Sequence, residues 1–282
     1  MRCAWQAYLN LLPSWMRPVV DEVGERNLQE LRMRIGAPPK MVLNGSTQTF
    51  GRAVIPEDLT YCVNAASRYS PWAAGTAAHG YLTTPGGHRL GICGSVVISD
   101  GVLTGIRTPT SLCLRVARDF PGIARNAFEP NRSVLIIGKP GSGKTTLLRD
   151  LIRQVSNIGQ QNVSVVDERG ELFPVVRDQF VFQCGEHIDV LTGCPKVTGV
   201  EMVLRTMGPS YIAVDEITAE SDCAALVHAG WCGVKLLATA HAGSREDLLS
   251  RPVYKPLLDY GLFDILLILK ADKTWTMERC RV

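Results

Sequence analysis

Eight consecutive residues, Gly138–Thr145, limit what this chain can fold into more than any other segment. They read Gly-Lys-Pro-Gly-Ser-Gly-Lys-Thr and match the pattern G-x-x-x-x-G-K-[ST] at every fixed position. The apolar run Ser133–Ile137 precedes them and the helical pattern Thr145–Gln154 follows, which is the context that the pattern requires. Glycines allow backbone N–H groups and the helix N-terminus to approach a phosphate closely. The segment therefore predicts the phosphate-binding loop of a P-loop nucleoside triphosphatase.

The predicted cofactors are ATP and Mg²⁺. We expect Lys144 to reach the β- and γ-phosphates, which gives it a catalytic role, and the Thr145 hydroxyl to ligate Mg²⁺. The residues predicted to contact the nucleotide are Gly138, Lys139, Pro140, Gly141, Ser142, Gly143, Lys144, Thr145 and Thr146.

Two further apolar segments end in acidic residues. Tyr211–Val214 is followed by Asp215 and Glu216, and Val163–Val166 is followed two residues later by Glu168. In a parallel sheet, the carboxyl ends of the strands line the ligand crevice. We expect Asp215 to hold the metal through water and Glu216 to orient or deprotonate the attacking water. Glu168 is a competing candidate for the general base.

Two basic residues are candidates with open alternatives. His241 ends the apolar run Leu236–Ala240, where a polar group can sense the γ-phosphate, although a histidine satisfied at a strand end is an equal alternative. Arg205 precedes the acidic strand and either forms a surface salt bridge or reaches phosphate across a subunit interface. Both are included among the predicted catalytic residues.

The pattern of elements predicts an α/β fold in two domains. From Ser133 onward, short apolar runs alternate with helical stretches, which indicates a parallel sheet covered on both faces. We predict a RecA-like P-loop core over residues 126–282, preceded by a smaller mixed α/β domain over residues 1–125. In the smaller domain, Asn44-Gly45 is a hairpin signal, and Pro56–Ser67 has a helical pattern with two acids in its first turn.

Composition narrows the remaining possibilities. No apolar run approaches the roughly 20 residues of a membrane-spanning helix, and the first ten residues lack a signal-peptide core. We therefore expect a cytoplasmic protein without direct membrane insertion. The nine cysteines show no metal-ligand spacing and are expected to be reduced and buried. Residues 1–125 hold 13 Lys and Arg against 8 Asp and Glu, too small an excess to argue for nucleic acid.

With these residues in place, nearly the whole chain resembles the stage III sporulation protein AA family, within the type II and type IV secretion ATPase superfamily. The P-loop is generic, whereas the Gly-Gly-His-Arg and Asp-Val-Leu-x-Gly-Cys-Pro-Lys segments are specific. The matching segments are Leu31–Pro38, Gly86–Gly91, Val166–Arg169, Asp189–Lys196, Arg205–Pro209, Val214–Ile217, Thr239–His241 and the tail from Arg251-Pro252 through Phe263-Asp264.

The resemblance implies a homo-hexameric motor ATPase that energises a membrane-associated secretion or channel complex during endospore formation. It implies partners among membrane proteins and a peripheral position at the inner face of a membrane. It also implies an acidic box at Glu168, a Walker B glutamate at Glu216 and a histidine box at Thr239 and His241. The arginines implied to approach phosphate from the N-terminal domain are Arg89, Arg115 and Arg118. Thr218 departs from the family pattern, which usually has glycine there.

Two other functions remain open. One is a nucleotide-binding switch or scaffold with little turnover, which would bind ATP without releasing phosphate. The other is a RecA-like ATPase stimulated by single-stranded nucleic acid, which would need a basic groove lined with aromatic residues. Aromatic residues are dispersed in this chain, so no nucleic-acid partner is expected.

Overall fold

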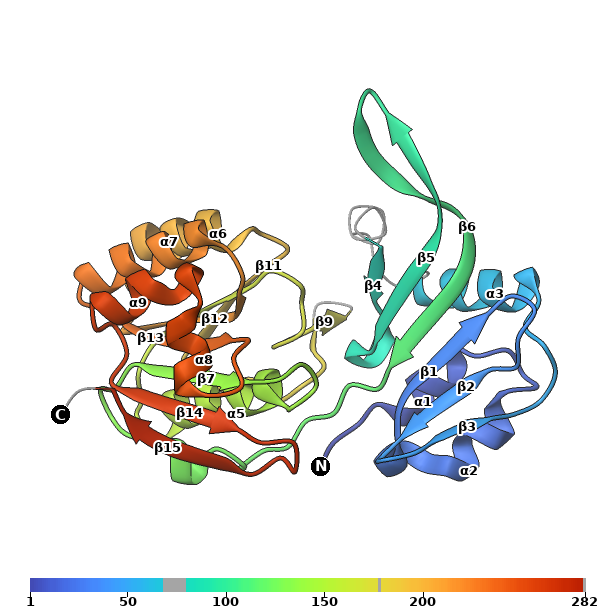
Figure 1. Cartoon of the computed structure of the whole chain (residues 1–282), viewed down its shortest axis with the longest axis horizontal. Helices are drawn as coiled ribbons and strands as arrows, with labels where there is room; N and C mark the ends of the chain where they lie inside the picture. Colours follow the sequence, from blue (N-terminus) through green and yellow to red (C-terminus); the bar gives the residue numbers. More distant parts are fainter. Residues whose placement is uncertain (68–79, 177–178, 281–282) are drawn as a thin grey trace. The chain divides into compact units, whose positions relative to one another are not determined.

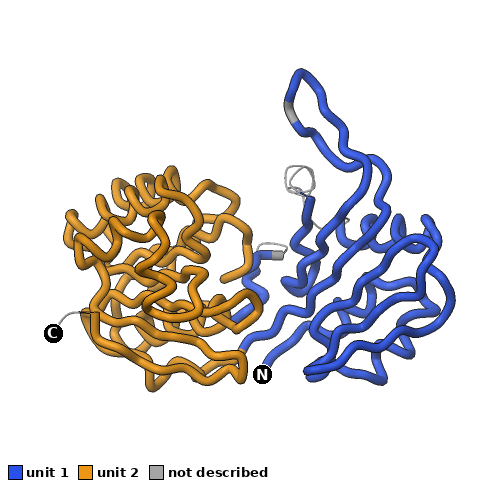
Figure 2. The backbone as a smooth tube through the Cα atoms, in the orientation of Figure 1, with its two compact units in different colours: residues 1–119, 174–182 blue, residues 120–173, 183–282 orange. Residues whose placement is uncertain are grey.

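The computed structural model describes residues 1–67, 80–176 and 179–280, which form two compact units (Figures 1 and 2). Unit 1 comprises residues 1–119 and 174–182, and unit 2 comprises residues 120–173 and 183–282. The chain therefore returns to unit 1 for a short segment in the middle of unit 2. The domain division at residue 125 stays a prediction.

Unit 1 is built on a six-stranded antiparallel sheet in the order β3-β2-β1-β6-β5-β4. Alternation in β1 places Leu31 and Met33 in the core and leaves Arg32 and Arg34 on the other face. The predicted hairpin and helix are present as β2–β3 and α3. The elements are α1 (Trp5–Asn10), α2 (Arg17–Asn27), β1 (Leu28–Arg34), β2 (Lys40–Leu43), β3 (Thr47–Thr49), α3 (Pro56–Ser67), β4 (Tyr81–Thr83), β5 (Arg89–Ser99) and β6 (Val102–Arg115), with the short pair β9 (Val175–Val176) and β10 (Gln179–Phe180).

Unit 2 contains a seven-stranded sheet in the order β11-β8-β12-β13-β7-β14-β15. All neighbouring strands are parallel except the edge strand β15, so the predicted parallel α/β sheet is confirmed. Its strands are β7 (Val134–Gly138), β8 (Val163–Asp167), β11 (Ile188–Thr192), β12 (Tyr211–Ile217), β13 (Lys235–Ala240), β14 (Ile265–Leu269) and β15 (Trp275–Arg279). Its helices are α5 (Lys144–Asn157), α6 (Lys196–Thr206), α7 (Glu220–Trp231), α8 (Arg245–Ser250) and α9 (Lys255–Asp259).

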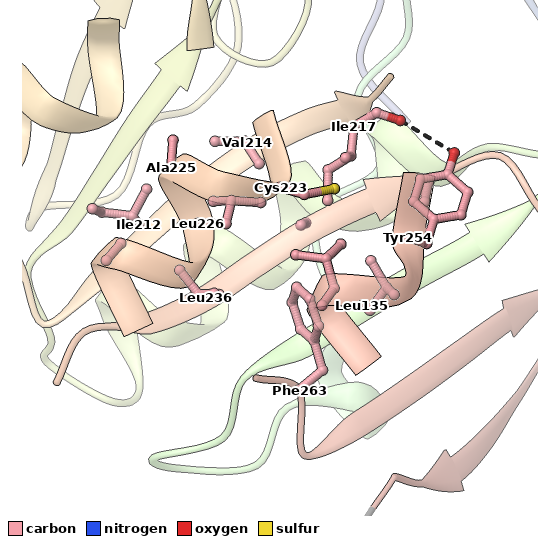
Figure 3. Packing of buried hydrophobic residues seen from close by; sticks show 14 of the residues in the cluster. Leu135, Ile212, Val214, Ile217, Cys223, Ala225, Leu226, Leu236, Tyr254 and Phe263 are labelled. Carbon is pink, nitrogen blue, oxygen red and sulfur yellow. Dashed lines mark hydrogen bonds between the residues drawn. The ribbon is translucent and has the colours of Figure 1, made fainter. Parts of the chain in front are cut away.

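Two apolar clusters cover the two faces of this sheet. Ile212 and Val214 of β12 pack with residues of α6 and α7, whereas Tyr211 and Ala213 pack with residues of α5. Figure 3 shows the first cluster, in which the Tyr254 hydroxyl donates a 3.2 Å hydrogen bond to the Ile217 carbonyl oxygen. Burial on both faces explains why these strands are continuous apolar runs. It also fixes where their carboxyl ends lie relative to the helices.

The cysteines differ from the prediction. All nine are free thiols, but only Cys62 and Cys223 are buried, while Cys93 and Cys232 are exposed. Cys93 lies on the face of β5 opposite the buried neighbour Ile92, so strand alternation rather than apolar character sets its exposure. Among the helices of the described residues, none is long and apolar enough to cross a bilayer.

Candidate functional site

The Gly138–Thr145 loop joins the end of β7 to the start of α5. Gly141 and Gly143 have φ values of 73° and 104°, a region that favours glycine. A Cβ atom on Gly138 would lie 2.6 Å from the Ser142 hydroxyl and 3.1 Å from the Leu269 carbonyl oxygen. The glycines of the pattern are therefore required by the path of the backbone itself.

Lys144, the first residue of α5, folds back over this loop. Its ammonium group lies 3.0 Å from the Gly138 carbonyl oxygen, 3.1 Å from the Lys139 carbonyl oxygen and 3.1 Å from His241 Nδ1. Burial lowers the pKa of Lys144, and the nearby charges of Asp215 and Glu216 oppose this shift. The predicted lysine and histidine are thus brought together from two different strand ends.

The Asp215 carboxylate is held by hydroxyl groups on both of its oxygens. Thr145 donates to Asp215 Oδ2 at 2.7 Å, and Thr239 donates to Asp215 Oδ1 at 2.5 Å. The Glu216 backbone N–H in turn donates to the Thr239 hydroxyl at 2.7 Å. Thr145 and Asp215 present the hydroxyl and carboxylate oxygens that Mg²⁺ accepts alongside phosphate oxygens and water. The donor set therefore fits the predicted metal.

A second observation fits a phosphate ligand. Within the part of the chain that the structure describes, the buried Ser142 hydroxyl has no hydrogen-bond partner. Buried hydroxyl groups in proteins are nearly always satisfied. Its position inside the glycine-rich loop makes a bound phosphate oxygen a suitable partner.

Glu216 occupies an unusual backbone position. Its φ is 56°, and the pairing of β12 with β13 shifts register between Val214 and Ile217. A residue other than glycine in this region costs on the order of 1 kcal/mol, and such strain gathers at functional sites. The side chain lies between two basic residues: Oε1 is 3.1 Å from His241 Nε2, and Oε2 is 2.5 Å from Arg169 Nη1.

Glu168 points to a different partner. Its Oε2 lies 2.5 Å from the Lys196 ammonium group, which is also 3.8 Å from Asp222 Oδ2. The Lys196 side chain is only 8% exposed, so this charge is kept beside the two carboxylates. The pocket at this end of the sheet is lined by Asp167, Glu168, Arg169, Glu171, Lys196, Asp215 and Glu216.

Asp167, at the end of β8, binds backbone N–H groups of the loop that follows it. Its carboxylate accepts hydrogen bonds from the backbone N–H groups of Glu171, Leu172 and Phe173 at 2.9–3.0 Å. Burial raises the pKa of Asp167 to about 6, although these N–H groups act in the opposite direction. Asp167 therefore fixes the loop that carries Glu168 and Arg169.

Comparison with known proteins gives the family. A family model described as "Sporulation stage III, protein AA" matches residues 5–278. The chain belongs to this family. The stage III sporulation protein AA of Bacillus subtilis (strain 168) is 36% identical over 280 residues, covering 93% of this chain and 90% of that protein. The uncharacterized protein ycf45 of Porphyra purpurea is 29% identical over 89% of this chain, which spans 43% of that relative.

Solved structures of bacterial ATPases share the fold of this family member. The ATPase DotB of Legionella pneumophila matches with a TM-score of 0.55 at 18% identity, over 95% of this chain and 80% of that chain. DotB of Yersinia pseudotuberculosis matches with a TM-score of 0.58 at 15% identity, over 94% of this chain and 77% of that chain. The pilus retraction motor PilT with bound ADP matches with a TM-score of 0.56 at 14% identity, over 89% of this chain and 76% of that chain. At these identities, the likeness concerns the fold.

The other predicted arginines make the following contacts within their own units. The Arg205 side chain is 80% exposed at the end of α6, where its ion pair with Glu201 spans 3.9 Å. In unit 1, Arg118 donates to the carbonyl oxygens of Glu25 and Leu28, Arg115 pairs with Glu30 at 3.3 Å, and the Arg89 guanidinium lies 4.6 Å from the Tyr81 ring centre. Their predicted contacts with phosphate stay predictions.

Sequence reasoning missed both basic residues of the pocket, Arg169 and Lys196. Each is part of a segment that carries the family resemblance: Arg169 directly follows Glu168, and Lys196 ends the Gly-Cys-Pro-Lys run. A basic residue beside a predicted catalytic carboxylate was the available signal for Arg169. Lys196 meets Glu168 only through the tertiary fold, because α6 begins 28 residues further along the chain.

Proposed function

We propose that this member of the sporulation stage III protein AA family is a Mg²⁺-dependent ATP hydrolase with a RecA-like P-loop core. The observation that carries the proposal is the continuous set of contacts from Lys144 through His241 to Glu216, beside the Thr145–Asp215 pair. Phosphoryl transfer to water depends mainly on positioning and on neutralising charge. The site gathers the side chains that such a reaction uses.

Each residue has a distinct role in this proposal. The Gly138–Thr145 loop, continued by Thr146, would receive the phosphates through its backbone N–H groups, and Lys144 would turn from the loop carbonyls to the β- and γ-phosphates. Thr145 and Asp215 would hold Mg²⁺, which supplies charge neutralisation at the phosphate oxygens. His241 contacts both Lys144 and Glu216, so it is placed to relate phosphate binding to the position of the base.

The contacts favour Glu216 over Glu168 as the general base. Glu216 is connected through His241 to Lys144, the residue expected to meet the γ-phosphate. Both carboxylates form a 2.5 Å ion pair, Glu216 with Arg169 and Glu168 with Lys196, so the link through His241 is what distinguishes them. We therefore assign Glu216 to water activation and Glu168 to holding Lys196 near the start of α7.

We extend the proposal to a homo-hexameric motor that energises a membrane-associated complex in endospore formation. Membership of the sporulation family and the fold shared with DotB and PilT support this extension. In such a ring, Arg205 or an arginine of unit 1 would approach the phosphate of a neighbouring subunit. This part of the proposal concerns partners, and it can fail while ATP hydrolysis stands.

The first test is steady-state phosphate release by the full chain with Mg-ATP, alongside light scattering for mass and with or without single-stranded DNA. We expect turnover that rises as a ring forms and does not respond to DNA. Lys144→Ala should abolish ATP binding, and Glu216→Gln should retain binding but lose turnover. Normal hydrolysis by Glu216→Gln, with loss in Glu168→Gln, would move the base to Glu168. Tight binding without release in any condition would leave a nucleotide switch.

A further inference from the structure

The chain passes between the two units at three points. Near each point, backbone atoms form hydrogen bonds with side chains from the middle of one helix. The crossings lie at residues 119/120, 173/174 and 182/183. On the unit 2 side, each is held by Arg149, Asp150 or Arg153 of α5. These three side chains are 4%, 0% and 3% exposed. Helix α5 is also the helix that begins at Lys144 in the candidate nucleotide site.

Asp150 holds the first crossing. Its two carboxylate oxygens accept the backbone N–H groups of Gly122 at 2.9 Å and Ala124 at 2.7 Å. Arg153 lies 3.0 Å from the same fully buried carboxylate and orients it toward these N–H groups. The segment that enters unit 2 from unit 1 is thus fixed to α5 through one side chain.

Arginines hold the other two crossings. Arg149 donates from Nε to the Leu172 carbonyl oxygen and from Nη2 to the Glu171 carbonyl oxygen, the latter at 2.6 Å. Arg153 donates from Nη1 to the Gln183 carbonyl oxygen at 3.2 Å. Glu171 and Leu172 lie two and one residues before Phe173, where the second crossing begins, and Gln183 is the first residue after the third crossing.

Packing alone does not account for the burial of Arg149, Asp150 and Arg153. Two buried guanidinium groups and a buried carboxylate must all be taken out of water, and apolar side chains of similar volume often stabilise a core equally well. What the charged groups provide is directional hydrogen bonding to particular backbone atoms. Arg149 lies five residues after Lys144, about 7.5 Å along a continuous helix, so a shift at the helix start is carried to the crossings.

Within unit 1, the segment between the second and third crossings is anchored at a turn. A Cβ atom added to Gly87 would lie 2.7 Å from Pro174 Cγ and 3.6 Å from Phe182 Cζ, so both ends of the segment pack against this glycine. Phe182 is only 3% exposed. The same turn leads into β5 at Arg89, one of the arginines that the resemblance implies for phosphate contact.

We propose that Arg149, Asp150 and Arg153 are positioning residues that couple occupancy of the Gly138–Thr145 loop to the three crossings and, through residues 174–182, to the Gly86–Arg89 turn. This inference rests on the proposed nucleotide site. It adds that α5 is the element through which nucleotide binding in unit 2 is communicated to unit 1.

The test is hydrogen–deuterium exchange of the full chain with and without Mg-ADP, with ADP affinity measured separately by calorimetry. In the wild type, we expect ADP to slow exchange in residues 138–145 and, by about fivefold or more, in residues 120–124 and 171–176. Arg149→Lys keeps the charge but lacks the two-nitrogen fork. It should keep loop protection and ADP affinity within about threefold, and lose the ADP effect in residues 171–176. Arg132→Lys, at an exposed position of unit 2, is the matched control.

Gly87→Ala tests the other end without touching unit 2. Gly101 is its matched control, because the φ values are similar, 75° and 78°, whereas a Cβ on Gly101 meets nothing within 4 Å. Gly87→Ala should abolish the ADP effect on the amides of Val175 and Val176 and lower kcat with little change in KM, and Gly101→Ala should do neither. If ADP protects the loop but not the crossings of the wild type, the coupling is refuted and the nucleotide site stands. If ADP protects nothing, both proposals fail.

Discussion

Replacing Asp167 by asparagine isolates the cost of a buried charge at the end of β8. The carboxylate is 2% exposed and accepts three backbone N–H groups from residues 171–173. Burial nevertheless raises its pKa from 3.8 to about 6, so desolvation outweighs the hydrogen bonds. The amide of asparagine keeps one acceptor oxygen and carries no charge at any pH.

The sign and size of the effect follow from this shift. Because the pKa is higher in the folded state, the folded protein binds the proton more tightly than the unfolded chain does. The resulting stability is fully present below about pH 3.8 and is lost as the pH rises through about 6. A difference of about 2 pKa units, at 1.36 kcal/mol each, corresponds to roughly 3 kcal/mol in the free energy of unfolding.

The assay is urea unfolding of the wild type and Asp167→Asn at pH 4 and pH 7.5. The difference between the two proteins cancels groups that titrate in both. We expect the wild type to lose about 2–3 kcal/mol relative to the variant between the lower and the higher pH. Asp189→Asn, at an exposed position of the neighbouring strand β11, should show no such change. A wild-type advantage that grows with pH would refute the reasoning, because it would mean that the N–H groups dominate.

Three further predictions concern other buried or paired groups. Glu216→Gln should lower turnover by about 10²-fold or more, whereas Glu168→Gln should lower it less; steady-state phosphate release measures both. Burial lowers the pKa of His88 to about 4, so its stabilising effect is present above pH 6.5 and is lost as the pH falls through about 4. The difference in unfolding free energy between the wild type and His88→Gln should therefore shrink as the pH falls over this range. Arg118→Ala should lower the free energy of unfolding, measured with urea, by about 2–3 kcal/mol, because two carbonyl groups lose a charged donor. Arg115→Ala, which removes a side chain that is 60% exposed, should lower it by less than about 1 kcal/mol.

Elements with a strong local pattern were predictable from the sequence. The helix over Pro56–Ser67 and the Asn44-Gly45 hairpin depend on neighbours in the chain, and so do the apolar strands that became β7, β8, β12 and β13. The return of residues 174–182 to unit 1 depends instead on Pro174 and Phe182 packing against Gly87. No periodicity or turn signal encodes a contact between residues so far apart, so the sequence alone did not reveal it.

The residues of the candidate site also divide into those that the local sequence predicted and those that depend on tertiary contacts. The residues that follow apolar strands were found because parallel strands place their carboxyl ends at one edge of a sheet. Lys196 was not found, because its charge matters only when α6 brings it to Glu168. Arg149, Asp150 and Arg153 lie within the predicted helical pattern Thr145–Gln154, which gives no sign of their burial, because charged residues of a helix are usually solvated. Their burial reflects the three crossings, a property of chain topology.

The order of the strands explains why a histidine connects the lysine of the loop to the proposed base. Strand β13 lies between β7, which leads into the loop, and β12, which carries Glu216. The residue after β13 is therefore placed between the other two strand ends, and His241 presents one ring nitrogen to each side. A residue without two opposed polar atoms could contact Lys144 or Glu216 but could not link them. If the proposed hydrolysis is correct, this central position makes His241 the residue whose loss should separate nucleotide binding from turnover.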